Sequence, residues 1–273
     1  MPRRLPQAVI RVAILMRCLG ALLFITSSAL ALAQERGLPL DRLRSGSTYM
    51  SAEQKAMQAD DFANPAMLWV ERGAKLWNAR VGSAPKSCAD CHRDARESMK
   101  GVATRYPAFD SGARRLLDLE GRINQCRTVQ QGAPALAFES EDMIGLTAHV
   151  ATQSRGMPLK VAVDGPTAPH FERGRLLYQR RIGQMNLACN HCHEDNAGRR
   201  LLAETISQGH PNAYPIYRLE WQSAGSLQRR LRACYSGVRA ELPPYESADL
   251  LDLSLFLAWR AQGLAIETPG VRR

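Results

Sequence analysis

Apolar residues recur with helical spacing in several parts of the chain, most clearly over residues 143–153 and 250–261. Apolar side chains that fall three or four positions apart predict an amphipathic helix with one buried face. Each of the two stretches is followed by a glycine, Gly156 or Gly263, the residue type typical of the position just after a helix. We therefore expect two similar helices about a hundred residues apart.

The two helices belong to an internal repeat. Glu71-Arg72-Gly73 recurs as Glu172-Arg173-Gly174, and Gly82 recurs as Gly183, all at an offset of 101 residues. Further along, residues 138–143 resemble residues 245–250 at an offset of 107. The helical patterns and their spacing are thus duplicated as a block.

Each repeat contains a C-x-x-C-H motif, Cys-Ala-Asp-Cys-His at 88–92 and Cys-Asn-His-Cys-His at 189–193. This motif is typical of c-type haem attachment. Two thiols on one helical turn can add to the two vinyl groups of the porphyrin, and the next histidine can then reach the iron. A lone C-x-x-C would also suit a redox pair or half of a zinc site, but the histidine and the second copy favour haem. We expect two covalently bound haem c groups, attached through Cys88, Cys91, Cys189 and Cys192, with His92 and His193 as iron ligands.

A helix, an attachment turn and a second helix form the plan of a small class I cytochrome c. The duplication therefore predicts an all-α protein with two tandem class I cytochrome c-like domains, over residues 65–155 and 170–273. The Pro/Gly-bearing stretch 156–169 is expected to be the linker. Residues 34–64 show no clear periodicity and are expected to form an N-terminal extension.

The first 33 residues have the pattern of an export signal. Four arginines precede an apolar run over residues 19–32, which ends in Ala31-Leu32-Ala33, and no acidic residue occurs before Glu35. The run is short for a transmembrane span of about 20 residues, although an uncleaved N-terminal anchor is the alternative. We predict a signal peptide over 1–33, a periplasmic location and no stable membrane insertion after cleavage.

Charge and cysteine content narrow the function further. The whole chain has 36 basic and 26 acidic residues, and the chain after residue 33 retains 32 basic residues against the same 26. This small surplus, without basic runs interleaved with aromatics, gives no reason to expect a nucleic-acid partner. Cleavage also removes Cys18, so Cys126 and Cys234 remain besides the four attachment cysteines.

Cys126 and Cys234 are our preferred candidates for the second axial ligand of each iron. After His193 the chain has no methionine, and its only later histidine is His210. The first repeat also offers Met99, Met143, Met157 and His149. The alternatives are two inert thiols or a Cys126–Cys234 disulfide, which would need a special orientation of the two domains. A thiolate ligand stabilises ferric iron and lowers its reduction potential.

The two attachment motifs, the cysteine after each, and Arg230 four residues before Cys234 resemble the SoxA family. Members are subunits of the SoxAX cytochrome of sulfur-oxidising bacteria. The resemblance extends roughly from Ala66 to the C-terminus, and its most specific part is Arg-Arg-Leu-Arg-Ala-Cys-Tyr-Ser-Gly at 229–237.

The resemblance implies an enzyme that oxidatively joins thiosulfate to a cysteine of the carrier protein SoxYZ, in a heterodimer with the monohaem cytochrome SoxX. It implies that Cys234 is the catalytic residue, which in the family carries an extra sulfur as a persulfide. Arg230 would bind the anionic substrate. His92 and Cys126 would ligate the first haem, and His193 and Cys234 the second.

The residues themselves agree with this chemistry but leave alternatives open. Arg230 and Cys234 stand at i and i+4 of a helical stretch, so a guanidinium fork shares a face with the thiol. Arg230 could instead pair with a haem propionate. A dihaem thiosulfate dehydrogenase forming tetrathionate is a second candidate, although its second haem typically has a methionine ligand. A non-catalytic periplasmic electron carrier is a third candidate, and a peroxidase a weaker fourth.

Overall fold

The computed structural model describes residues 40–273, so the predicted signal peptide (1–33) and the start of the predicted extension lie outside the described residues. The short 3-10 helix η1 (Leu40–Arg42) belongs to an N-terminal unit. Residues Arg44–Arg273 form a second unit, which contains both sequence repeats.

Two helix pairs at repeat-equivalent positions carry the fold of this second unit. Helix α3 (Met67–Asn78) packs against α7 (Glu141–Thr152), and α8 (Ala168–Gln179) packs against α11 (Ala248–Arg260). A β-carbon at Gly73 would lie only 2.0 Å from the Gly145 carbonyl oxygen, and one at Gly174 only 2.1 Å from that of Asp252. The repeated Glu-Arg-Gly sequence therefore marks two close helix crossings that require glycine.

Shorter elements lie between the helices of each pair. In the first repeat they are α4 (Cys88–His92), α5 (Ala95–Ser98), η3 (Ala103–Arg105), β1 (Ala108–Asp110), β2 (Arg115–Leu117) and α6 (Leu119–Gln130). In the second they are α9 (Cys189–His193), β3 (Arg200–Leu201), β4 (Glu204–Thr205), β5 (Ile216–Arg218), β6 (Ser223–Gly225) and α10 (Leu227–Gly237). Helices α6 and α10 start at the side-chain caps Asp118 and Ser226, which accept from the backbone N–H groups of Gly121 and Arg229.

Helices are the commonest regular elements of residues 40–273, but the all-α prediction omitted three small sheets there. Strands β1 and β2 form an antiparallel hairpin, as do β3 and β4. Strand β5 lies between β6, which is antiparallel to it, and β7 (Gly270–Arg272), which is parallel. Strands of two or three residues are too short to show an alternating pattern in the sequence.

The predicted extension and linker are more ordered than their sequences suggested. The extension contains η2 (Gly46–Tyr49) and α2 (Ala52–Ala59), and Gln58 Oε1 accepts a hydrogen bond of 3.0 Å from the backbone N–H of Val271 in β7. The linker stretch contains η4 (Gly165–Thr167), and helix α8 starts at Ala168, two residues before the predicted domain boundary.

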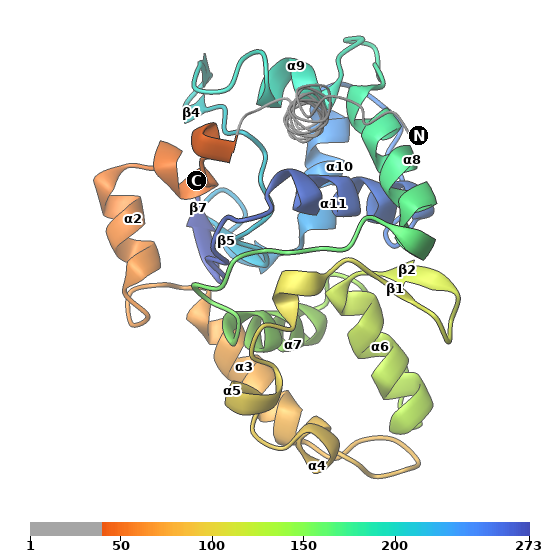
Figure 1. Ribbon diagram of the computed structural model, residues 1–273. Coiled ribbons are helices and arrows are strands. Elements are labelled where there is room, and N and C mark those ends of the chain that lie inside the picture. Colours follow the sequence, from red (N-terminus) through yellow and green to blue (C-terminus); the bar gives the residue numbers. More distant parts are fainter. Residues whose placement is uncertain (1–39) are drawn as a thin grey trace, which may run out of the picture. The chain divides into compact units, whose positions relative to one another are not determined.

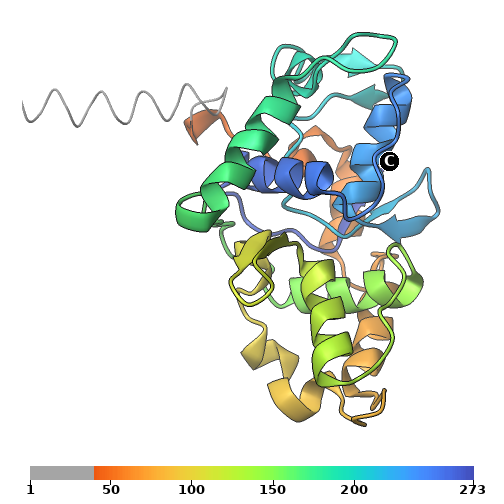
Figure 2. The ribbon, with the colours of Figure 1, turned by 90° about the vertical axis from the view of Figure 1, so that its right-hand side faces the viewer.

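The two repeats pack directly against each other. In Figures 1 and 2, the first-repeat helices α3 to α7 lie below the second-repeat helices α8 to α11. Leu116 of β2 belongs to the hydrophobic core built around α11. Phe138 and Tyr245, which correspond in the repeat, stack with ring centroids 4.9 Å apart. The two repeats therefore have a similar arrangement of elements and also form an interface with each other.

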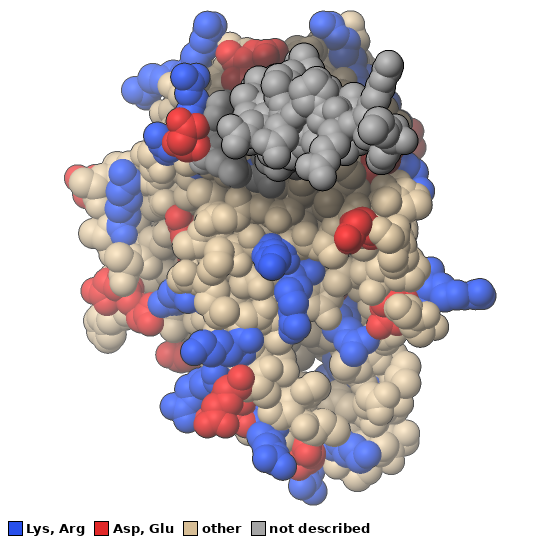
Figure 3. Space-filling model, in the orientation of Figure 1, with Lys and Arg blue, Asp and Glu red and all other residues tan. Residues whose placement is uncertain are grey.

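One face of the molecule is mixed in charge. On the face shown in Figure 3, lysine and arginine side chains are interspersed with aspartate and glutamate. Within residues 40–273, no helix is both long enough and apolar enough to cross a membrane.

Candidate functional site

His193 is held in one orientation at the end of α9. Its Nδ1 lies 2.8 Å from the carbonyl oxygen of Ser207, which can only accept a hydrogen bond. The proton must therefore be on Nδ1, which leaves the Nε2 lone pair available for a metal. Cys189 and Cys192 precede His193 on the same short helix.

Cys234 of α10 lies next to this histidine. Burial raises the pKa of its thiol, but the neighbouring His193 ring and the Arg230 and Arg218 guanidinium groups lower it, to about 7. The structure thus brings together two predicted iron ligands, His193 and Cys234, which come from different helices and are 41 positions apart in the sequence.

Arg230 stands one helical turn before Cys234 and interacts with it. The Cys234 thiolate is the main cause that raises the pKa of Arg230. No hydrogen bond or ion pair joins its guanidinium to another side chain of the described residues. Arg230 is therefore a partly buried cation beside the sulfur of Cys234, with its donor fork available to an anion.

In the first repeat, Cys126 of α6 lies near the attachment helix α4. Burial raises the pKa of Cys126, the nearby Arg122 guanidinium opposes this, and the nearby Cys91 adds to the increase. Burial and then the nearby Cys126 likewise raise the pKa of Cys88. The ring of His92 lies 5.8 Å from that of Trp77. The structure thus places Cys126 near α4, the helix that contains His92, the other predicted ligand of the first haem.

The alternative ligands of the first repeat occupy different environments. Met143 is fully buried in α7, and its sulfur lies 3.8 Å from the hydroxyl of Thr147, so it belongs to the core. Met99 packs against the hydrophobic cluster that also contacts Cys88. The His149 ring lies 5.8 Å from that of Trp77, and burial lowers its pKa.

The described thiols and donors suit covalently attached haem. Cys88, Cys91, Cys126, Cys189, Cys192 and Cys234 are all free, so no Cys126–Cys234 disulfide is present. No group of three or more His, Cys, Asp or Glu side chains in residues 40–273 is arranged to hold a bare metal ion. A pair such as His193 and Cys234 fits an iron that takes its other four ligands from a porphyrin.

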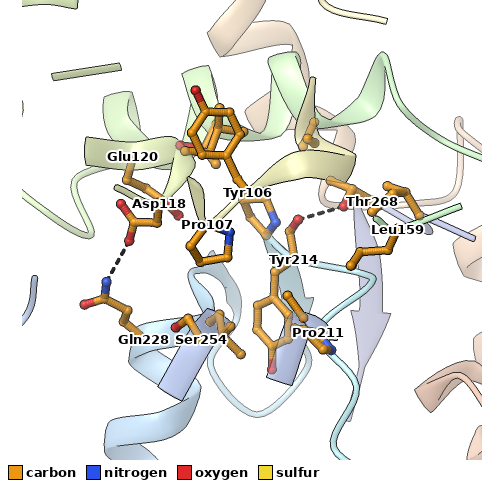
Figure 4. A pocket seen from close by; sticks show the side chains of 18 residues that line it. Tyr106, Pro107, Asp118, Glu120, Leu159, Pro211, Tyr214, Gln228, Ser254 and Thr268 are labelled. Atoms are coloured by element: carbon orange, nitrogen blue, oxygen red, sulfur yellow. Dashed lines mark hydrogen bonds between the residues drawn. The ribbon is translucent and has the colours of Figure 1, made fainter. Parts of the chain in front are cut away.

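A separate cavity of about 100 Å³ lies between the repeats and contains none of the predicted site residues. Figure 4 shows Tyr106, Asp118 and Glu120 of the first repeat facing Tyr214 and Gln228 of the second across it. Cys234 and Arg230 influence the pKa of Tyr214, so this tyrosine lies between the cavity and the second-repeat site. The cavity belongs to the interface and not to the thiolate site.

Sequence reasoning did not identify two residues of the second site. The backbone of Ser207 orients His193, and a carbonyl carries no signal in the sequence. Arg218 affects Cys234 from strand β5, 16 positions away. The sequence did contain a signal for Arg218. The corresponding position of the first repeat, 108 residues earlier, is Asp110, so the charge is reversed between the two copies.

An attachment helix with free thiols, and a histidine whose Nε2 is available beside a thiolate, define a c-type cytochrome. Residues 72–159 match the family model described as the SoxA/TsdA cytochrome c domain, which supports covalently bound haem c. The SoxA subunit of L-cysteine S-thiosulfotransferase from Pseudaminobacter salicylatoxidans is 43% identical, over 88% of this chain and 85% of that protein. The corresponding subunit from Paracoccus pantotrophus is 38% identical, over 85% of this chain and 80% of that protein.

The similarity extends to a solved structure. A chain of SoxXA from P. pantotrophus matches with a TM-score of 0.82 and 37% identity, covering 85% of this chain and 87% of that one. The chain belongs to the SoxA family.

Proposed function

We propose that this protein is the SoxA subunit of an L-cysteine S-thiosulfotransferase, which oxidatively joins thiosulfate to a cysteine of a carrier protein. The observation that carries the proposal is Cys234, a partly buried thiol beside His193, with the guanidinium of Arg230 one helical turn away. The names of the similar SoxA proteins support the same activity.

The reaction balances as thiosulfate plus a carrier thiol giving the carrier S-thiosulfonate, one proton and two electrons. A sulfur–sulfur bond forms, and the two sulfur atoms that form it are oxidised together by two electrons. Cys189 and Cys192 would hold the haem, which would supply an iron able to accept electrons one at a time. Cytochrome acceptors would take up the two electrons of this balance.

The residues of the second repeat divide the remaining work. Arg230 binds the oxygen atoms of thiosulfate through its planar fork and directs the terminal sulfur toward Cys234. Cys234, whose pKa is lowered to about 7, would form a sulfur–sulfur bond with the sulfane sulfur as the two electrons leave. Attack of the carrier thiolate on that sulfur would then break this bond, form the carrier S-thiosulfonate and release the Cys234 thiolate. The hydrogen bond from His193 Nδ1 to Ser207 keeps Nε2 directed away from that carbonyl.

The proposal includes two haem c groups, two tandem domains (65–155 and 170–273) and specific ligand sets. His92 and Cys126 would ligate the first iron, with Cys88 and Cys91 as thioether attachments. His193 and Cys234 would ligate the second, with Cys189 and Cys192 as attachments. The intact mass of protein matured in a host with haem-attachment machinery tests the number of haems directly.

The partners follow from the same proposal. A SoxX-like monohaem cytochrome would form the heterodimer, which the likeness to a SoxXA structure supports. A SoxYZ-like carrier and thiosulfate would be the substrates, and the reaction would take place in the periplasm.

The decisive experiment incubates the holo-heterodimer with thiosulfate, the carrier protein and an oxidised cytochrome acceptor. We expect the mass of the carrier to increase by one S-thiosulfonate group. The Cys234→Ala and Arg230→Ala variants should lose this product, whereas Arg122→Ala, the first-repeat counterpart of Arg230, should retain it. Tetrathionate without a modified carrier would instead identify a thiosulfate dehydrogenase. If neither product forms, the remaining candidate is a non-catalytic electron-transfer cytochrome.

A further inference from the structure

The two repeats carry opposite charges at one equivalent position. Cys126 and Cys234 are related by an offset of 108 residues, as are Arg122 and Arg230. The same offset relates the last residue of β1, Asp110, to the last residue of β5, Arg218. Both residues stand in strands that form equivalent hairpins, with Asp110 opposite Arg115 and Arg218 opposite Ser223.

In the first repeat, the acidic residue neutralises the arginine beside the cysteine. Arg122 Nη1 donates to Asp110 Oδ2 at 2.7 Å and to the side-chain oxygen of Gln125 at 2.6 Å. Both of these bonds use Nη1, so one nitrogen of the guanidinium is already bonded to protein oxygens. The adjacent Asp110 carboxylate would also repel an incoming anion.

In the second repeat, Arg218 replaces that carboxylate, so Arg230 has no acidic partner from this strand. In the first repeat the strand end reaches the arginine, since Asp110 Oδ2 lies 2.7 Å from Arg122 Nη1. The repeat places Arg218 and Arg230 at the same two positions. The charges of both arginines also lower the pKa of Tyr214. Arg218 and Arg230 thus act on the same small region, although they come from β5 and α10.

The buried side chain of Arg218 forms hydrogen bonds with only part of its guanidinium group. It is only 4% exposed, and its Nη2 donates to Glu204 at 2.8 Å and to Glu220 at 2.9 Å. Its Nε is buried and has no hydrogen-bond partner among residues 40–273. A buried N–H without an acceptor is costly, so a group that supplies an oxygen atom there would be stabilised.

Thiosulfate carries two negative charges and must approach a thiolate that carries a third. One guanidinium compensates one of these three charges. A second arginine near the same cysteine would compensate one more and so reduce the repulsion further. The carboxylates of Glu204 and Glu220 are 38% and 64% exposed, so solvent screens much of their opposing charge.

We propose that Arg218 is a second binding residue for the sulfur oxyanion at Cys234, and that the Asp110/Arg218 difference confines anion binding to the second repeat. This inference rests on the proposed function and adds a residue that sets where the substrate binds. Arg230 and Arg218 would hold the oxyanion from two elements, while the first repeat would be closed to it by its own Asp110–Arg122 pair.

The test compares the holo-heterodimers carrying Arg218→Gln, Arg218→Lys and the matched first-repeat control Asp110→Asn. Arg218→Gln should raise the KM for thiosulfate by roughly 10- to 100-fold, the contribution of one hydrogen bond to a charged group, with little change in kcat. Arg218→Lys keeps the charge without the fork and should have an intermediate KM. Asp110→Asn should leave the KM and kcat at Cys234 unchanged, because it lies in the other repeat, and it should add sulfate binding beside Arg122.

A measurement without turnover separates substrate binding from a purely structural role. Calorimetric titration with sulfate, an unreactive oxyanion, should show the same loss of affinity in Arg218→Gln, while the visible haem spectrum stays that of the unmodified protein. If the Arg218→Gln protein does not mature, the Arg218→Lys variant tests the inference instead. An unchanged KM for thiosulfate in that variant would overturn it.

A third variant leaves Arg218 in place. Glu204→Gln alters a partly exposed side chain and removes a competing negative charge, so it should lower the KM for thiosulfate, and a higher KM would count against the inference. Failure of the unmodified heterodimer to form the carrier S-thiosulfonate would reject the proposed function. Normal turnover with an unaltered KM in Arg218→Gln would reject only the role of Arg218.

Discussion

Gln228 of the second repeat donates a hydrogen bond of 2.7 Å to Asp118 of the first, across 110 positions of the sequence. The other oxygen of Asp118 accepts from the backbone N–H of Gly121 at 2.8 Å and caps α6. The side-chain oxygen of Gln228 accepts from the backbone N–H of Glu246 at 2.8 Å. One buried amide therefore connects the starts of α6 and α10 with the segment that leads into α11.

Replacing Gln228 with alanine should destabilise the folded protein. The change leaves a buried oxygen of Asp118 and the N–H of Glu246 without partners, at a cost of about 1–3 kcal/mol for each group that water cannot reach. Urea unfolding of the haem-loaded protein measures the loss. Gln130→Ala, at an exposed position of α6, is the control and should change stability by no more than about 0.5 kcal/mol. Equal stability of the two variants would contradict the role assigned to Gln228.

The carboxyl groups at this interface should make stability depend on pH. Burial raises the pKa of Asp118 to about 6 and that of Glu120 well above its usual value. A carboxyl with a higher pKa in the folded state stabilises the fold below about pH 4, and loses that contribution as the pH rises through about 6. We expect the free energy of unfolding to fall by about 2–3 kcal/mol between these limits, at about 1.4 kcal/mol per pKa unit.

Glu120→Gln tests this pH dependence, because the amide cannot ionise. The variant should show a flatter stability profile between about pH 4 and 7 than the unmodified protein. The matched control Glu97→Gln changes an exposed glutamate of α5 and should leave the slope unaltered. An unchanged slope in Glu120→Gln would show that this carboxyl ionises normally.

The close crossing of α3 and α7 should not tolerate a side chain at Gly73. An added β-carbon would lie 2.0 Å from the Gly145 oxygen and 2.6 Å from the His149 β-carbon, so the helices must move apart. We expect Gly73→Ala to cost about 1–3 kcal/mol or more, as overpacking does in other cores. Gly237→Ala in α10 meets no atom within 4 Å and should be neutral or stabilising. Thermal unfolding of both variants gives the comparison.

Substitution of each proposed thiolate ligand should raise the reduction potential of only one haem. An anionic sulfur stabilises ferric iron, so Cys234→Ala and Cys126→Ala should each shift one titration wave upward and leave the other in place. Cys126→Ala should still form the carrier S-thiosulfonate. Spectroelectrochemical titration and magnetic circular dichroism measure these effects. Spectra of the His/Met type from both haems in the unmodified protein would exclude thiolate ligation.

The sequence was most informative where the chemistry is local. The spacing of Cys189, Cys192 and His193 predicts an attachment helix because all three lie within five positions, and a helix is present there. The amphipathic patterns placed α7 and α11 within two residues of their observed bounds, and Gly156 and Gly263 both adopt the positive φ expected after a helix. The strands were missed because hairpins as short as β1–β2 depend on contacts with the surrounding fold.

By itself, the sequence determined that this protein has two repeats, two attachment motifs and a cysteine with an arginine one turn before it in each. Covalent geometry and helical periodicity act over a few residues, so a linear pattern is enough to read them. Only the tertiary structure decided that Ser207 orients His193, that Gln228 holds Asp118, and that Arg218 adds a second positive charge at Cys234. Those relationships join distant segments, and they arise from the way the chain packs, because no local propensity encodes which segments meet.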